Sequence, residues 1–176
     1  MKGSITKTGE NKWRLVFDME RGIDGKRRQK VIRFNGSKKD AEKKLRDTIG
    51  EYEQGKFVDP SNQRLADYLD YWLTMIKNSV QPKTFERYAQ MVRVNINPAL
   101  GQIKLQELKT RHLDEAYMEM LSNGRLDGEG GLAPKTIRNI HGVLSLALKK
   151  AMTWQLNWSN PAIDVTLPKV EHQEIM

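Results

Sequence analysis

Two kinds of hydrophobic periodicity divide the chain. From residue 12 to residue 20 the positions alternate, and one side of the alternation holds Trp13, Leu15, Phe17 and Met19. This period of two predicts a half-buried β-strand. A second strand is predicted over residues 27–35, with Ile32 and Phe34 on the inner side, and Asp24-Gly25 supplies the turn between the two strands. A short leading strand around residues 4–7 would complete an antiparallel sheet of three strands.

The period changes to that of a helix after residue 36. Ser37-Lys38-Lys39-Asp40 predicts a helix start of the capping-box type. The apolar positions that follow are Ala41, Leu45, Ile49 and Tyr52. We expect this helix to cover the inner face of the sheet. Residues 55–62 interrupt the helical period and include Gly55 and Pro60, so the boundary between two modules is placed there.

The second module has four helical patterns. The first places Leu65, Tyr68, Leu69, Trp72, Leu73 and Ile76 on one face, and core packing explains all six. The next begins at Pro82, turns Phe85, Tyr88, Val92 and Ile96 inward, and is expected to end at Asn97-Pro98. A third pattern near residues 110–122 has Leu113, Tyr117 and Leu121 inward. The last begins near Pro134 and buries Ile137, Ile140, Leu144, Leu148 and Ala151. The predicted fold class is therefore an α+β module, a three-stranded antiparallel sheet packed on one helix, followed by an all-α bundle of four helices.

The positive charge is concentrated in the first module. The chain has a formal net charge of +8 and a pI near 9.6. Residues 1–58 carry 16 Lys and Arg against 9 Asp and Glu, whereas residues 59–176 carry 14 against 13. Such clustering is typical of proteins that bind polyanions. On charge alone, a soluble protein that happens to be basic is an equally good interpretation.

Several kinds of chemistry find no support in the sequence. Cysteine is absent, and the three histidines, His112, His141 and His172, have no metal-ligand or triad spacing. We therefore expect no metal site and no cofactor. The glycines between residues 124 and 131 lack the Gly-Lys-Ser/Thr ending of a phosphate-binding loop, so they are interpreted as a helix connection. With no apolar run of about 20 residues and no signal peptide, we expect a cytoplasmic protein that does not enter a membrane.

Two groups of residues are candidates for binding DNA. The first lies on the outer face of the predicted sheet and consists of Lys12, Arg14, Arg27, Gln29 and Arg33. A narrow antiparallel sheet can lie in the major groove, although a solvated sheet face also carries charges. The second group lies in the first turns of two helices and consists of Lys83, Thr84, Arg87, Lys135, Arg138 and Asn139. Helix N-termini suit phosphate contacts, but periodicity alone favours ordinary solvated helix starts here.

Several motifs resemble those of a known family. Pro82-Lys83-Thr84-Phe85-Glu86-Arg87-Tyr88, Asn97-Pro98-Ala99-Leu100-Gly101, Asn160-Pro161-Ala162 and Leu167-Pro168-Lys169 resemble, in this order, the core-binding domain of tyrosine recombinases. Met1-Lys2-Gly3-Ser4-Ile5, Lys12-Trp13-Arg14 and Arg27-Arg28-Gln29-Lys30 resemble the arm-binding domain of integrases from phages and conjugative transposons.

This resemblance implies a domain plan. Residues 1–57 would be an arm-type DNA-binding domain, 58–64 a linker, 65–168 a SAM-like core-binding domain that clamps crossover-site DNA, and 169–176 the start of a further linker. The second candidate group matches positions at which such integrases touch DNA. The implied partners are arm-type and core-type double-stranded DNA, other integrase protomers, and an excisionase or DNA-bending protein. The implied role is site-specific integration and excision of a mobile element.

The resemblance places the catalytic domain beyond Lys169, so we expect this chain to bind DNA and to contain no catalytic residue. Of its five tyrosines, Tyr52, Tyr68, Tyr88 and Tyr117 fall on apolar helix faces, and none, Tyr71 included, follows a His-x-x-Arg motif. The parent protein would cleave DNA through a 3′-phosphotyrosyl intermediate. Two other classes stay open: a free-standing transcriptional or architectural DNA-binding protein, and a protein-interaction module, which predicts little affinity for DNA.

Overall fold

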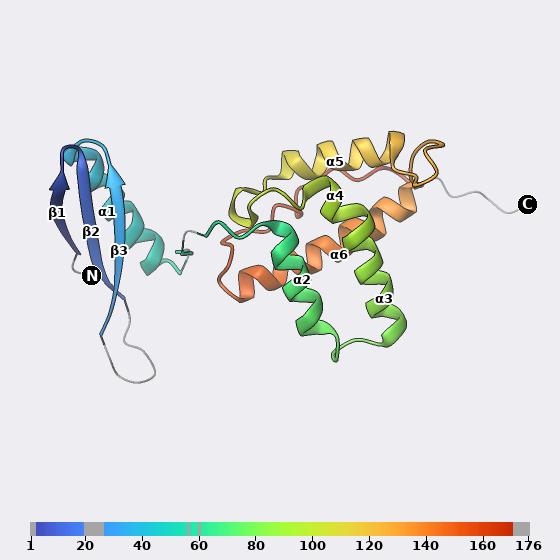
Figure 1. Cartoon of the computed structure of the whole chain (residues 1–176), viewed down its shortest axis with the longest axis horizontal. Helices are drawn as coiled ribbons and strands as arrows, with labels where there is room; N and C mark the ends of the chain where they lie inside the picture. The colour runs from blue at the N-terminus through green and yellow to red at the C-terminus, as the bar shows by residue number, and fades with distance from the viewer. Residues whose placement is uncertain (1–2, 20–26, 56, 60, 171–176) are drawn as a thin grey trace, which may run out of the picture. The chain divides into compact units, whose positions relative to one another are not determined.

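The computed structural model describes residues 3–19, 27–55, 57–59 and 61–170. It divides into two compact units, residues 1–58 and residues 59–176. Each unit has its own hydrophobic core. The two units are coloured blue to teal and green to red in Figure 1.

The first unit is a three-stranded antiparallel sheet covered by one helix. Strands β1 (Gly3–Gly9), β2 (Lys12–Met19) and β3 (Arg28–Asn35) lie in that order, and helix α1 (Lys38–Glu53) packs on one face. The predicted strands, helix and fold class are confirmed. The predicted Asp24-Gly25 turn lies outside the described residues.

Alternation places the large apolar side chains of the sheet under α1. Leu15 and Phe17 are buried against Ala41 and Leu45, and Trp13, Met19, Ile32 and Phe34 pack around them. Phe57 extends this core, since its ring lies edge-on to Phe17 with 5.6 Å between centroids. The start of α1 is fixed by Ser37, whose side chain accepts a hydrogen bond of 3.2 Å from the backbone N–H of Asp40, as the sequence predicts.

The second unit is a helical bundle. Its long helices are α2 (Leu65–Ile76), α3 (Pro82–Met91), α5 (Thr110–Asn123) and α6 (Pro134–Thr153). Between α3 and α5 lie a π-helical turn (Val92–Ile96), the short helix α4 (Asn97–Leu100) and a 3₁₀ turn (Leu105–Glu107). α3 and α6 each begin with proline, which has no N–H to leave unpaired in a first turn. The predicted bundle is confirmed.

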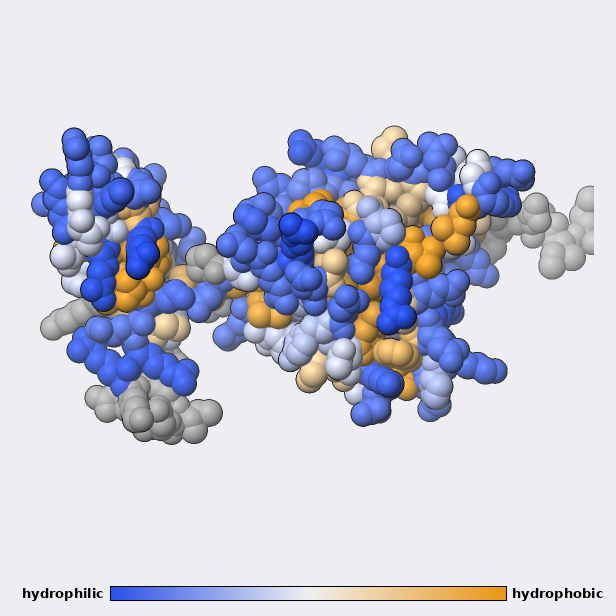
Figure 2. Space-filling model, viewed as in Figure 1, coloured by the Kyte–Doolittle hydropathy of each residue, from blue (hydrophilic) through white to orange (hydrophobic). Residues whose placement is uncertain are grey.

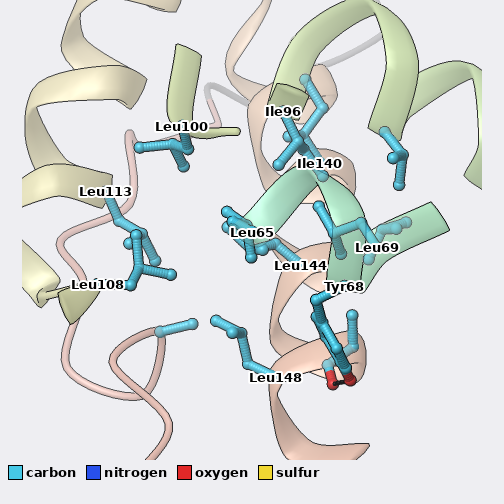
Figure 3. Packing of buried hydrophobic residues seen from close by; sticks show 14 of the residues in the cluster. Leu65, Tyr68, Leu69, Ile96, Leu100, Leu108, Leu113, Ile140, Leu144 and Leu148 are labelled. Carbon is cyan, nitrogen blue, oxygen red and sulfur yellow. Dashed lines mark hydrogen bonds between the residues drawn. The ribbon is translucent and has the colours of Figure 1, made fainter. Parts of the chain in front are cut away.

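Leucine and isoleucine from α2, α5, α6 and the π-helical turn fill the centre of the bundle, as Figure 3 shows around Leu65, Ile96, Ile140 and Leu144. Tyr68 is also buried there, and its hydroxyl donates a hydrogen bond of 2.6 Å to the carbonyl oxygen of Ala147. The five inward positions predicted for α6 are all fully buried. Truncating one of them, such as Leu144, to alanine would cost about 2–5 kcal/mol of folding free energy.

Two predictions about helices are wrong. Asn97-Pro98 does not end the second helix, because the chain continues through the π-helical turn into α4. There the N–H of Asn97 bonds to the carbonyl of Val92, five residues back, and this wider turn accommodates a proline that would otherwise crowd the preceding turn. Leu121 is not inward but 42% exposed, and Met120 and Ala116 are buried in α5 instead.

The segment after α6 returns along the bundle. Asn157 donates to the carbonyl of Leu105, and the N–H of Thr166 donates to Asp114 on α5. Val165 and Leu167 pack against the core from this segment. We call this segment, residues 157–169, the returning strap. It carries the Asn-Pro-Ala and Leu-Pro-Lys motifs and lies against both α5 and α6.

Candidate nucleic-acid interfaces

The sheet face that α1 leaves uncovered carries the first candidate group. In the pairing register of β2 with β3, Arg14 lies directly opposite Arg33 and Lys12 directly opposite Asn35. β1 adds Thr6 beside Arg14. All these side chains are exposed. The sheet register therefore brings Lys12, Arg14 and Arg33 together, as predicted.

The arginine pair has an unusual electrostatic environment. Like charges directly opposite each other in a sheet repel, which is normally unfavourable by a few tenths of a kcal/mol to about 1 kcal/mol. Among the described residues, no carboxylate forms an ion pair or hydrogen bond with Lys12, Arg14 or Arg33. A hollow of about 540 Å³ opens beside them, and its lining includes Thr8, Lys12, Arg14, Val31, Arg33 and Asn35. This end of the face is suited to an anionic ligand.

Arg27 and Gln29, in contrast, are bonded to a carboxylate. The guanidinium of Arg27 makes a bidentate pair with Asp18, with N–O distances of 2.8 and 3.0 Å, and the amide of Gln29 donates to the same carboxylate at 3.0 Å. Arg27 and then Gln29 hold the pKa of Asp18 below its usual value. The sequence placed Asp18 at the hairpin end but did not indicate that it would bind both candidates.

One residue was missed on this face. Asn35 is exposed and follows the same alternation as Arg33, so its position could have been predicted by extending the pattern by two residues. Asparagine is one of the side chains that can read adenine in the major groove.

The second candidate group forms two patches on the helical unit. Lys83 and Arg87 are exposed on the first turns of α3, with Thr84 half-buried beside them. Lys135 and Asn139 are exposed at the start of α6. The starts of α3 and α6 lie at separate corners of the bundle in Figure 1, so these residues do not form one continuous site.

The guanidinium group of Arg138 forms a hydrogen bond within the protein. Its Nε donates a hydrogen bond of 2.9 Å to the carbonyl oxygen of Pro168 on the returning strap. His141, one turn further on, is half-buried and lies 3.4 Å from the hydroxyl of Tyr117. Burial, and then the charge of Arg138, lower the pKa of His141.

Other motifs noted in the sequence have structural explanations. In the glycine-rich connection, Arg125 pairs with Asp127, whose carboxylate also accepts the N–H of Glu129. The carboxylate of Asp127 thus accepts the kind of backbone N–H that a bound phosphate would need as a donor. His112 accepts a hydrogen bond from the N–H of Lys109 at the start of α5, and His172 lies outside the described residues. Within the described ranges, no group of three or more His, Asp or Glu could hold a metal ion.

The described helices include none that is both long and apolar enough to cross a bilayer. The hydrophilic surface dominates the view in Figure 2, and apolar patches are enclosed by it on each unit.

Comparison with known proteins identifies both units. Residues 4–52 match the family model of the arm DNA-binding domain, and residues 64–121 match that of the phage integrase N-terminal SAM-like domain. Each unit therefore matches a domain model of phage integrases, as its motifs predicted. An integrase from Streptomyces ambofaciens is 24% identical over 144 residues, which are 81% of this chain and 35% of that protein. The chain thus spans about a third of the length of this curated relative.

Solved structures agree with this assignment. The integrase-like domain from Bacillus cereus is 27% identical, with a TM-score of 0.57 over 66% of this chain and 93% of that one. The phage integrase SAM-like domain from Moorella thermoacetica is 29% identical, with a TM-score of 0.52 over 66% of this chain and 97% of that one. A lambda integrase dimer bound to a COC′ core site, 15% identical, matches with a TM-score of 0.52 over 96% of this chain and 46% of that one, and shows the fold alone.

Proposed function

We propose that residues 1–176 bind double-stranded DNA through two surfaces, as the N-terminal region of a tyrosine-type integrase. The observation that carries the proposal is the cationic group on the sheet formed by Lys12, Arg14 and Arg33, with which no carboxylate of the described part of the chain pairs. An arrangement of like charges that opposes folding is explained if, in the complex, a phosphate neutralises it or a guanine edge accepts its hydrogen bonds.

The sheet would bind arm-type sites. A two- or three-stranded ribbon fits the major groove, which is about 12 Å wide, and arginine pairs well with the O6 and N7 atoms of guanine. The match of residues 4–52 to an arm DNA-binding domain supports this surface. Arg27 and Gln29 would contribute only after exchanging Asp18 for DNA, so we rank them below Arg14 and Arg33.

The helical unit would bind core-type sites through two patches. Lys83, Thr84 and Arg87 would contact one stretch of backbone, and Lys135 with Asn139 another, because the two helix starts lie at separate corners. Arg138 would both hold the strap and lie beside the DNA. The known lambda integrase complex with a core site supports core binding in a protein of this fold.

The parent protein would be a recombinase that integrates and excises a mobile element through a 3′-phosphotyrosyl intermediate. Its partners would be DNA and other protomers, by analogy with the lambda integrase dimer bound to a COC′ core site and the lambda integrase tetramer bound to a Holliday junction. The catalytic set would come from sequence outside these 176 residues. A free-standing transcriptional role has no observation in its favour.

Binding to labelled duplex at several salt concentrations tests the proposal. The logarithm of affinity should fall linearly with the logarithm of salt concentration, with a slope of roughly −3 to −8 in total, since each neutralised phosphate contributes about −0.9. A slope near zero would contradict the proposal that the chain binds nucleic acid.

The division between the surfaces is tested with variants. Arg14→Ala and Arg33→Ala should weaken binding to arm-site DNA by about 1–3 kcal/mol and spare core-site DNA. Arg87→Ala and Lys135→Ala should do the reverse. Equal losses on both kinds of DNA for all four variants would contradict two separate surfaces.

A further inference from the structure

The centre of the exposed sheet face is apolar. Val31 on β3 is 43% exposed and lies directly opposite Val16 on β2, which is half-buried. Both side chains point away from α1, because they alternate with Leu15, Phe17 and Ile32, which face it. This pair belongs to neither the core nor the cationic group.

Its neighbours along the strands are polar on both sides. The Arg14 and Arg33 pair precedes it, and the pair of Asp18 and Gln29 follows it. Successive pairs on one face of a sheet are about 6.8 Å apart, which is twice the rise of roughly 3.4 Å per residue. The rise per base pair in DNA is also roughly 3.4 Å, so one step along the sheet corresponds to about two base pairs.

Taken with duplex binding by this face, on which this inference rests, the geometry points to a specificity-determining role for the valine pair: Val31, supported by Val16, contacts the 5-methyl group of a thymine about two base pairs from the guanine that Arg14 or Arg33 reads.

The chemistry of the major groove selects thymine. Valine has no hydrogen-bond donor or acceptor, and the thymine methyl is the one apolar group that a base pair presents in this groove. If Val31 faced the amino group of cytosine or adenine, that donor would lose its water without gaining a partner, which is unfavourable. A valine in the middle of a polar reading surface therefore discriminates against those bases as well as favouring thymine.

The simplest competing explanation is that valine is present for its strand propensity alone. That explanation predicts an effect of Val31 on folding stability and no dependence of binding on any methyl group of DNA. The two explanations are separated by changing the DNA, which leaves the folding of the protein untouched.

The experiment begins with selection of bound duplexes from a random pool by residues 1–176. In the selected site, each thymine is then replaced singly by deoxyuridine, which removes only the 5-methyl group, and affinity is measured by fluorescence anisotropy. We expect one position at which deoxyuridine weakens binding about threefold to tenfold. That position should lie about two base pairs from a guanine whose preference relaxes in Arg14→Ala or Arg33→Ala.

A substitution at Val31 tests the same contact from the protein side. Val31→Ser should bind thymine and deoxyuridine sites equally, while Val170→Ala, at a valine of similar exposure in the other unit, should keep the discrimination. Circular dichroism melting would establish that Val31→Ser is folded. If the chain selects a site but no deoxyuridine position matters, or if folded Val31→Ser still discriminates, the inference is overturned while duplex binding stands. If no duplex is bound at all, the proposed function fails with it.

Discussion

Arg14 and Arg33 lie where their like charges would oppose folding and would serve the proposed binding of DNA. Their guanidinium groups extend from directly opposed positions, and Lys12 adds a third cation on the same face. Relief of this repulsion by an anion would contribute to affinity. In the absence of an anion, the repulsion lowers the folding stability of the sheet unit, because like charges in opposed positions are destabilising.

This leads to a prediction about stability. Arg33→Gln should leave the free energy of unfolding of the sheet unit unchanged or raise it by up to about 1 kcal/mol, and should weaken duplex binding. Urea denaturation and anisotropy would measure the two effects. The matched control is Arg46→Gln, the same chemical change at an exposed position of α1, on the other side of the sheet. A clear loss of stability specific to Arg33→Gln would show that the pair is not strained by its charge.

His141 gives the helical unit a dependence on pH. Its pKa is lowered by burial and by Arg138, so the folded state favours the neutral imidazole. A lowered pKa means that stability is fully present above the ordinary value of about 6.5 and is lost as the pH falls below it. The unfolding free energy of the helical unit should therefore decrease between pH 7.5 and pH 5.5.

His141→Gln should flatten this decrease, because glutamine keeps a polar side chain but does not titrate. His112→Gln is the control, since it makes the same chemical change at a half-buried histidine near the start of α5. Equal pH dependence in the wild type and in His141→Gln would assign the effect to other groups.

At the scale of helices and strands, hydrophobic periodicity was sufficient to predict most of the fold. The alternation around Trp13, Leu15 and Phe17 was sufficient to place β2 and its inner face, and the helical spacing from Leu65 to Ile76 did the same for α2. The failure at Asn97-Pro98 has a physical cause. A proline forbids an ordinary continuation of a helix, and the π-helical turn that permits one depends on tertiary packing of Val92 and Ile96.

The candidate site was predictable to a smaller extent. Alternation put Arg14 and Arg33 on one face, but which residues lie opposite each other depends on the register, and the register depends on the turn. The capture of Arg27 and Gln29 by Asp18, and of Arg138 by Pro168, depends on side chains of distant strands and loops. No local pattern in the sequence encodes such contacts.

The segment that enters the helical unit supports a prediction about proteolysis. Residues 61–65 are bonded to residues 102–106: the N–H of Leu65 donates to Ile103, the N–H of Leu105 to Gln63, and the N–H of Ser61 to the Gln106 side chain. A protease must extend its substrate, so backbone already bonded in this way resists cleavage. Trypsin should cut after Lys56 before it cuts after Arg64, as mass spectrometry of timed digests would show.

Gln106→Ala tests the cause. It removes the side chain that bonds to Ser61 and to the carbonyl of Asp59. Cleavage after Arg64 should become faster and cleavage after Lys56 should keep its rate. Cleavage after Arg64 first in the wild type would mean that this segment opens more readily than its hydrogen bonds indicate.

The whole chain is two units with different electrostatic character. Residues 1–58 carry seven more basic than acidic residues, and residues 59–176 one more. Salt dependence of binding should therefore come mainly from the sheet unit, whereas the helical unit depends on a few local cations at the starts of α3 and α6.

The last prediction is that these 176 residues bind DNA without forming a covalent bond to it. Cleavage through tyrosine needs an accessible phenol beside several cations that converge on one phosphate. Tyr68 and Tyr117 are buried, and burial raises the pKa of both. The ring of Tyr88 stacks on Trp72, and that of Tyr52 packs against Phe17 and Phe57.

Tyr71 is the most accessible of the described tyrosines that belong to the helical unit, with half of its surface exposed. Its ring lies 5.5 Å from that of Trp154, and the ammonium of Lys150 lies over the same indole. One lysine beside an indole does not provide the set of cations that the reaction requires. A nicked suicide duplex that carries the selected site would trap any phosphotyrosyl adduct as a slower band on a denaturing gel. We expect no such band. If one appeared and Tyr71→Phe abolished it, the proposal that the catalytic set comes from outside these residues would be wrong.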